Sequence, residues 1–125
     1  MRVAEVARAN AKPTENLDAY DLYLRALPFH YAMTQEGLEE AQRLLENAIQ
    51  IDPQYSLAKA FLSFTLTIKS AQGWADDAER AQAIRLAKEA IAANRDDPVT
   101  LRWAGHTVAH TAESSRWEAW RSNAR

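Results

Sequence analysis

The sequence reads AQRLLENAI over residues 41–49 and AIRLAKEAI over residues 83–91. Aligned at an offset of 42, both stretches carry alanine at their first and eighth positions. Positions seven apart lie on one face of an α-helix, and small residues there let a second helix approach closely. The repetition therefore predicts two equivalent helices, each packed closely against a neighbour.

The segments that precede these two helices repeat as well. Ala26 corresponds to Ser63 at an offset of 37, and Ser63 corresponds to Gly105 at an offset of 42. A basic period of about 34 residues explains both offsets if the extra residues lie in the turn inside each hairpin. A longer turn in the second hairpin then shifts both the second helix of that hairpin and the first helix of the next, and both of these offsets are 42. The junctions between successive hairpins are predicted to keep one length, as stacking requires.

The composition favours helices and excludes several classes of protein. The 125 residues include 25 alanines but only three glycines, and alanine has the highest helix propensity. A net charge of −2 argues against nucleic-acid binding, and the absence of cysteine excludes disulfides and thiolate nucleophiles. No apolar run approaches the ~20 residues that span a bilayer. We expect an all-α protein of the cytoplasm, without a nucleic-acid or membrane partner.

Proline, glycine and aspartate mark the expected helix boundaries. Asp52-Pro53 and Asp97-Pro98 each resemble an N-cap followed by a first helical residue. Gly73 separates two helices, and Pro28 is expected to kink its helix or end it early. The predicted helices cover residues 2–11 (weakly), 16–31, 35–51, 53–71, 76–94, 98–111 and a short piece near 114–122.

In these features the chain resembles the tetratricopeptide family over about residues 17–111. The resemblance implies a right-handed α-solenoid fragment of stacked antiparallel helix-turn-helix repeats, with two full hairpins and an incomplete third. It departs from the family pattern because Leu22, Lys59 and Leu101 stand where the family has its first-helix tryptophan. The residues expected to pack the repeats are Ala26, Ala41, Leu45, Ala48, Pro53, Ser63, Ala83, Ala87, Ala90 and Gly105.

The expected organisation is an N-terminal segment or linker over 1–15, a repeat domain over 16–112 and a short helix or tail over 113–125. The stretches AYDLYLRAL and NRDDPVTLRWAGH also resemble, more loosely, helical-repeat modules attached to proteobacterial class III adenylate or guanylate cyclases. The chain contains no catalytic cyclase motif.

The resemblance implies a concave groove, lined by the first helix of each hairpin, that binds a peptide or helix of a partner protein. Because the lining is mostly apolar and aromatic, we expect a ligand with apolar or aromatic side chains and not an acidic tail. Filling of the core is the alternative role for members such as Leu57 and Phe64. The groove residues are Tyr20, Tyr23, Leu27, His30, Leu57, Ala60, Phe64, Thr67, Val99, Arg102, His106 and His110.

Metal binding and catalysis have weaker support. His106 and His110 share a helix face, and His30 could approach them, but packing or polar contacts are the more common role of such histidines. The acidic run from Asp76 to Glu79 is explained by capping at the start of a helix. No phosphate-binding loop or nucleophile motif is present, so we expect no enzyme, cofactor or metal.

The last residues leave two alternatives open. Trp117 and Trp120 are expected to pack back on the helix over 98–111, with a turn starting at Ser114 or Ser115. Alternatively, the two tryptophans mediate self-association, which would make the chain an oligomerisation or intramolecular regulatory module of a larger signalling enzyme.

Overall fold

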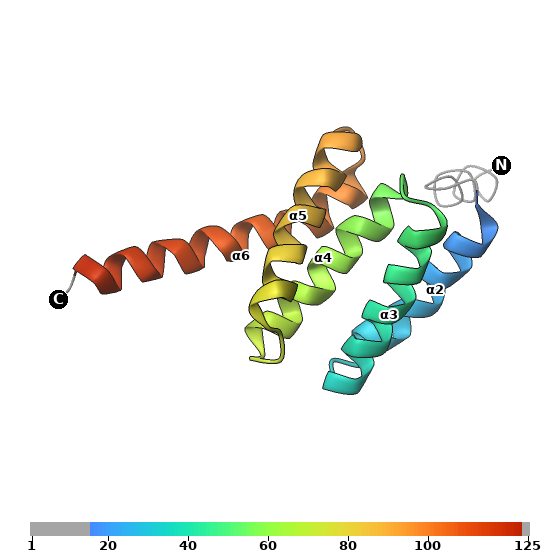
Figure 1. Cartoon of the computed structure of the whole chain (residues 1–125). Coiled ribbons are helices and arrows are strands. Elements are labelled where there is room, and N and C mark those ends of the chain that lie inside the picture. The colour runs from blue at the N-terminus through green and yellow to red at the C-terminus, as the bar shows by residue number, and fades with distance from the viewer. Residues whose placement is uncertain (1–15, 124–125) are drawn as a thin grey trace.

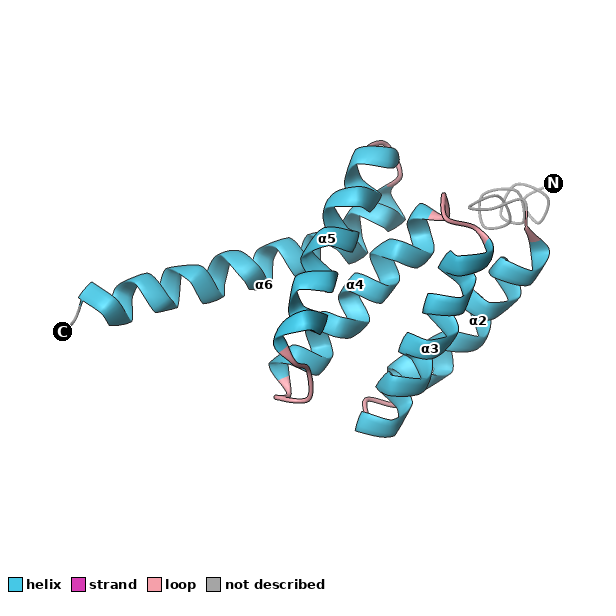
Figure 2. Ribbon diagram, in the orientation of Figure 1, coloured by secondary structure: helices cyan, strands magenta, loops and turns pink. Residues whose placement is uncertain are grey.

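Helices make up the regular structure of the part of the chain that the structure describes. The computed structural model describes residues 16–123, apart from the side chains of residues 114, 117 and 118, and contains no strand in that range. The helix expected over 2–11 lies outside the described residues. The helices are α2 (Leu17–Tyr31), α3 (Gln35–Ile51), α4 (Ser56–Ala71), α5 (Asp77–Ala93) and α6 (Pro98–Asn123) (Figures 1 and 2).

The junctions between helix pairs have the predicted equal length, whereas the turns agree with the prediction only in part. The α2–α3 turn covers residues 32–34, whereas the α4–α5 turn is longer and covers residues 72–76. The junctions α3–α4 and α5–α6 cover residues 52–55 and 94–97, so the two have the same length. The prediction of equal junctions is confirmed. The prediction that all the extra residues lie in the turn is only partly right: the offsets 37 and 42 differ by five residues, of which two lie in the longer α4–α5 turn and three in α4, which extends further past Ser63 than α2 does past Ala26.

Only the second of the two Asp-Pro pairs begins a helix. Asp97 caps α6, because its carboxylate accepts hydrogen bonds from the Thr100 amide at 3.2 Å and the Thr100 hydroxyl at 2.6 Å. Asp52 instead is the C-cap of α3, and α4 begins three residues after Pro53, at Ser56. The predicted helix start at Pro53 is therefore wrong. The prediction that Pro53 packs the repeats is wrong as well, because this proline lies exposed in the turn between α3 and α4.

Other boundaries follow local rules. Asp76 and Glu79 form a capping box at the start of α5, as the acidic run predicted. Gly73 follows the end of α4 with a φ of +80°, a conformation that glycine adopts without strain. Pro28 does not end α2 early, since the helix continues to Tyr31.

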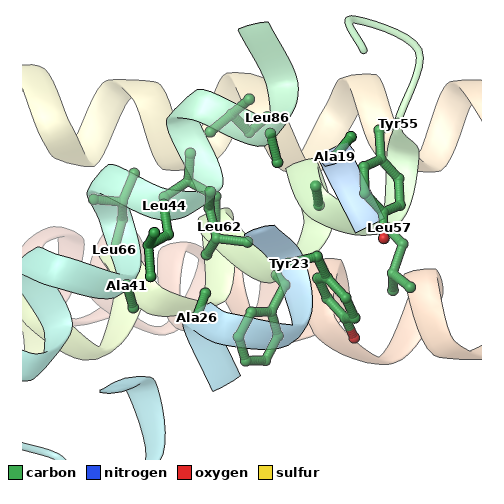
Figure 3. Close-up of a cluster of buried hydrophobic side chains, with 14 of the residues drawn as sticks. Ala19, Tyr23, Ala26, Ala41, Leu44, Tyr55, Leu57, Leu62, Leu66 and Leu86 are labelled. Carbon is green, nitrogen blue, oxygen red and sulfur yellow. The ribbon is translucent and has the colours of Figure 1, made fainter. Parts of the chain in front are cut away.

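The core lies around α4, which packs against α3, α5 and α6, while α2 packs mainly against α3 (Figure 1). Figure 3 shows side chains from α2, α3, α4 and α5 meeting in this core. The predicted packing residues Ala26, Ala41, Leu45, Ala48, Ser63, Ala83, Ala87 and Ala90 are all buried.

A buried lysine connects three helices. The Lys69 side chain is 3% exposed, and its Nζ donates hydrogen bonds to Gln42 Oε1 at 2.8 Å and Glu79 Oε2 at 2.9 Å. Burial alone would raise the pKa of the Glu79 carboxyl, but the hydrogen bonds from Lys69, Gln42 and the Asp76 amide outweigh it, and the net shift is downward. The network joins α3, α4 and the start of α5, and the sequence reading assigned Glu79 to capping alone.

Two glycines make a matched test of helix packing. A Cβ at Gly37 would lie 2.6 Å from the Phe29 carbonyl oxygen, whereas a Cβ at Gly105 would meet nothing within 4 Å. Gly37→Ala is expected to lower the free energy of unfolding by about 2 kcal/mol, because the start of α3 must move away from α2. Gly105→Ala should raise it by about 1 kcal/mol, since alanine is the better helix former. Urea denaturation of both variants measures the difference, and equal effects would contradict the close α2–α3 approach.

The same observation corrects the expected role of Gly105. Gly105 was predicted to pack the repeats. Because a Cβ at this position would meet no atom within 4 Å, no described residue lies close enough to require a glycine there.

The end of the chain also differs from the prediction. α6 continues without interruption through Ser114 and Ser115 to Asn123, so no turn brings residues 117–120 back onto its first half. The segment has no proline or glycine after Gly105 to break the helix. Figure 1 shows the second half of α6 extending away from the other helices. Trp120 is 60% exposed on this extension, and the side chain of Trp117 lies outside the described part.

In the described range 16–123, no helix combines the length and the apolar character that crossing a membrane requires.

Candidate functional site

Aromatic and histidine rings from α2, α4 and α6 form one connected set of contacts, here called the aromatic cluster. Each ring has at least one neighbour in the set with centroids within 6.4 Å. Its members are Tyr20, Tyr23, His30 and Tyr31 from α2, Tyr55 just before α4, Phe61 and Phe64 from α4, and Trp103 and His106 from α6.

Phe61 is the buried centre of the aromatic cluster. It is 0% exposed, and its ring lies 5.8 Å from Tyr23, 4.7 Å from His30 and 5.2 Å from Trp103. The edge-to-face angles to Tyr23 and Trp103, 75° and 80°, bring ring edges against ring faces, which is a favourable arrangement. One phenylalanine therefore joins all three helices.

Phe64 brings the aromatic cluster to the surface. Its partly exposed ring stacks on Trp103 at 5.0 Å and on His106 at 4.6 Å, with interplanar angles of 21° and 26°. The Arg102 guanidinium lies 5.3 Å from the centre of the Trp103 ring, which is within the range of a cation–π interaction. The partly exposed members of this group present flat rings beside one positive charge.

The sequence reading missed Phe61 and Trp103. Both directly neighbour selected positions, since Ala60 and Arg102 were assigned to the groove. Neighbouring residues of a helix point in directions about 100° apart, so an error of one position selects a different side of the helix. The large aromatic side chains of Phe61 and Trp103 were the sequence feature that could have identified them.

His30 is fully buried between α2 and α4. The Thr65 hydroxyl donates to the Phe61 carbonyl at 3.0 Å, so its oxygen accepts the bond from His30 Nδ1 at 2.8 Å. The network thus assigns the proton of the neutral ring to Nδ1. Burial lowers the pKa of His30 to about 4, because a second proton on Nε2 would be placed in an apolar environment.

Three buried polar atoms in and beside the aromatic cluster have no hydrogen-bond partner among the described residues: His30 Nε2, Tyr55 Oη and Trp103 Nε1. Each such atom costs about 1–3 kcal/mol relative to a satisfied one. Burial raises the pKa of Tyr23 to about 12 and also raises that of Tyr55, so both phenols stay neutral. These groups give the cluster a neutral interior.

The predicted groove residues divide into two groups. Tyr23, His30, Leu57, Ala60 and Thr67 are buried between helices. For these five the expectation of direct contact with a partner is corrected to packing, because side chains of neighbouring helices cover them. Tyr23 and His30 contact Phe61 of α4, and Thr67 contacts Thr107 of α6. Tyr20, Leu27, Phe64 and His110 are partly exposed, and Val99, Arg102 and His106 are exposed.

A pocket of about 300 Å³ lies between α4, α5 and α6. Thr67 and His110 line it, so these two residues belong to this pocket and not to the aromatic cluster. Thr107 also lines the pocket, and its hydroxyl forms a hydrogen bond with the Thr67 hydroxyl at 2.8 Å. The Arg80 guanidinium is engaged by Asp77 and by the Ala75 carbonyl. Thr67, Thr107 and Arg80 of the pocket wall are therefore already bonded to other groups of the protein.

Within residues 16–123, no group of three or more histidine or acidic side chains is arranged to hold a metal ion. His30 and His106 both contact the Phe64 ring and do not form a ligand pair with each other.

Comparison with known proteins returned no match: no family model, no curated protein and no solved structure is similar to this chain.

Proposed function

We propose that the chain is a non-catalytic protein-interaction module that binds a partner's peptide or helix on the face formed by α2, α4 and α6. The observation that carries this proposal is the aromatic cluster, which connects the three helices and reaches the surface at Tyr20, Phe64, Trp103 and His106. Rigid aromatic rings bury a large area at a small entropic cost, and such residues dominate binding energies at interfaces.

The arrangement of helices supports a repeat scaffold of the tetratricopeptide kind. The two junctions have equal length, and the equivalent alanines of α3 and α5 are buried in the same way. In the proposed scaffold, α2–α3 and α4–α5 are full hairpins and α6 is the first helix of an incomplete third. α2, α4 and α6 then line one side, which is where such scaffolds bind their partners.

The chemistry of this face favours an apolar or aromatic ligand. Among the residues selected for the face, Arg102 is the one with a permanent positive charge, and its guanidinium already lies over the Trp103 ring. One guanidinium pairs with one carboxylate, so the face lacks the several cations that an acidic tail would require. Binding driven by apolar burial persists at high salt, whereas binding by surface charges is screened.

A random peptide library displayed on phage and selected against the whole chain tests the proposal. We expect recovered peptides to contain aromatic or aliphatic anchors and to bind in 1 M NaCl within about threefold of their low-salt affinity. Phe64→Ala combined with His106→Ala should weaken binding at least about tenfold.

Arg85→Ala on α5, an exposed position outside the aromatic cluster, is the matched control and should leave binding unchanged. Selected peptides that are acidic and lost at high salt would contradict the proposed ligand class. Peptides equally weakened by the control would contradict the proposed face.

A further inference from the structure

The second half of α6 presents a surface that the proposed function does not use. α6 has 26 residues, and its C-terminal part extends away from the helices against which its first part packs (Figure 2). Isolated helices of about 12 residues are marginally stable in water. Packing against another molecule would therefore stabilise this extension.

Over residues 109–120, one side of α6 carries exposed residues at helical spacing: Ala109, Ala112, Glu113, Arg116 and Trp120. This side points away from Thr100, Ala104 and Thr107, through which α6 is buried against the body. It combines two small residues, two opposite charges and one large aromatic ring.

We infer that two copies of this chain associate through this surface, with their α6 extensions antiparallel. A two-fold interface must be complementary to itself. Glu113 and Arg116 meet this condition, because an antiparallel register that places Glu113 opposite Arg116 of the second copy necessarily forms the same ion pair twice. One helix therefore carries both the negative and the positive residue that the two-fold interface requires.

The same register also satisfies the apolar residues. The pairs Glu113–Arg116 and Ala109–Trp120 are both symmetric about the midpoint between residues 114 and 115, so one alignment forms both. Trp120 then packs on Ala109 of the second copy, beside the exposed Val108, and a large ring meets a small residue. Two independent features, charge and size, select one alignment.

Helices paired over about three turns bury less area than a standard interface of about 1,600 Å². We therefore expect a weak dimer with a dissociation constant in the micromolar range. Sedimentation equilibrium of the whole chain, from about 10 µM to about 1 mM, covers this range.

A charge swap tests the register. Glu113→Arg alone and Arg116→Glu alone create like-charge pairs, and each should raise the dissociation constant about tenfold. The double variant Glu113→Arg with Arg116→Glu restores opposite charges and should return to within about threefold of the original value. Trp120→Ala should weaken the dimer whatever the charges.

Circular dichroism checks that each variant remains folded. Phe64→Ala alters the aromatic cluster but not the α6 extension, so it should leave the dimer intact and separates this inference from the proposed function. A chain that stays monomeric over the whole range, or a double variant as weak as the single reversals, would overturn the inference. A partner of another kind on this surface would produce the first of these results.

Discussion

We expect the replacement of Phe61 by alanine to lower the free energy of unfolding by about 4 kcal/mol. The ring is fully buried, and it contacts rings from α2 and α6 as well as its own helix. Truncation removes the transfer free energy of the side chain and leaves a cavity between three helices that cannot all move inward together. Urea denaturation at neutral pH measures this loss.

Phe64→Ala is the control for Phe61→Ala. It lies one turn further along α4 and also contacts Trp103, but its ring is partly exposed. Its loss should therefore be smaller, about 1–2 kcal/mol, because less apolar area is removed from burial. If Phe61→Ala cost no more than Phe64→Ala, the proposed centre of the aromatic cluster would be wrong.

Acid destabilises the fold through His30. Above pH 6.5 the ring is neutral in both the folded and the unfolded chain, and its contribution does not depend on pH. Between pH 6.5 and about 4 the unfolded chain binds a proton that the folded chain excludes. Stability then falls as pH falls, by about 1.4 kcal/mol per unit and about 3 kcal/mol in total.

The His30 contribution is isolated by difference, because carboxyl groups also titrate in acid. Unfolding free energies of the natural chain and of His30→Leu, measured from pH 8 to pH 4, should diverge in slope below pH 6.5. The variant loses the titration but keeps an apolar side chain beside Phe61. Gly105→Ala, which removes no titratable group, should keep the slope of the natural chain. Parallel curves for the natural chain and His30→Leu would mean that the buried ring does not resist protonation.

The fold was largely predictable because its signals are local. The repeated alanines, the Asp97-Pro98 start and the Asp76 cap each depend on a few neighbouring residues, and the bounds of α3 and α5 follow from them. The prediction that Asp52-Pro53 begins a helix was wrong because the same dipeptide also occurs in turns that follow the end of a helix. The predicted end of α6 was wrong because Ser114 and Ser115 lower the helix propensity without breaking the helix.

The candidate site was less predictable because exposure depends on distances between helices. Helical periodicity placed Tyr23 and His30 on the inward side of α2, but it does not state that α4 covers them completely. Lys69 was missed for the same reason: its partners lie on α3 and α5, far away in the sequence. Phe61 and Trp103 show that the size of an aromatic side chain helps to predict which residues form the site, in addition to their position in the repeat.

The central claim is that α2, α4 and α6 together form one binding face, and nuclear magnetic resonance tests it most directly. A peptide selected from the library would be titrated into the ¹⁵N-labelled chain while amide and indole signals are followed. We expect the largest shifts at Leu27, Phe64, His106 and the Trp103 indole, with the amides along α3 and α5 nearly unchanged. Shifts concentrated on α3 and α5, with the Trp103 signal unmoved, would contradict the claim.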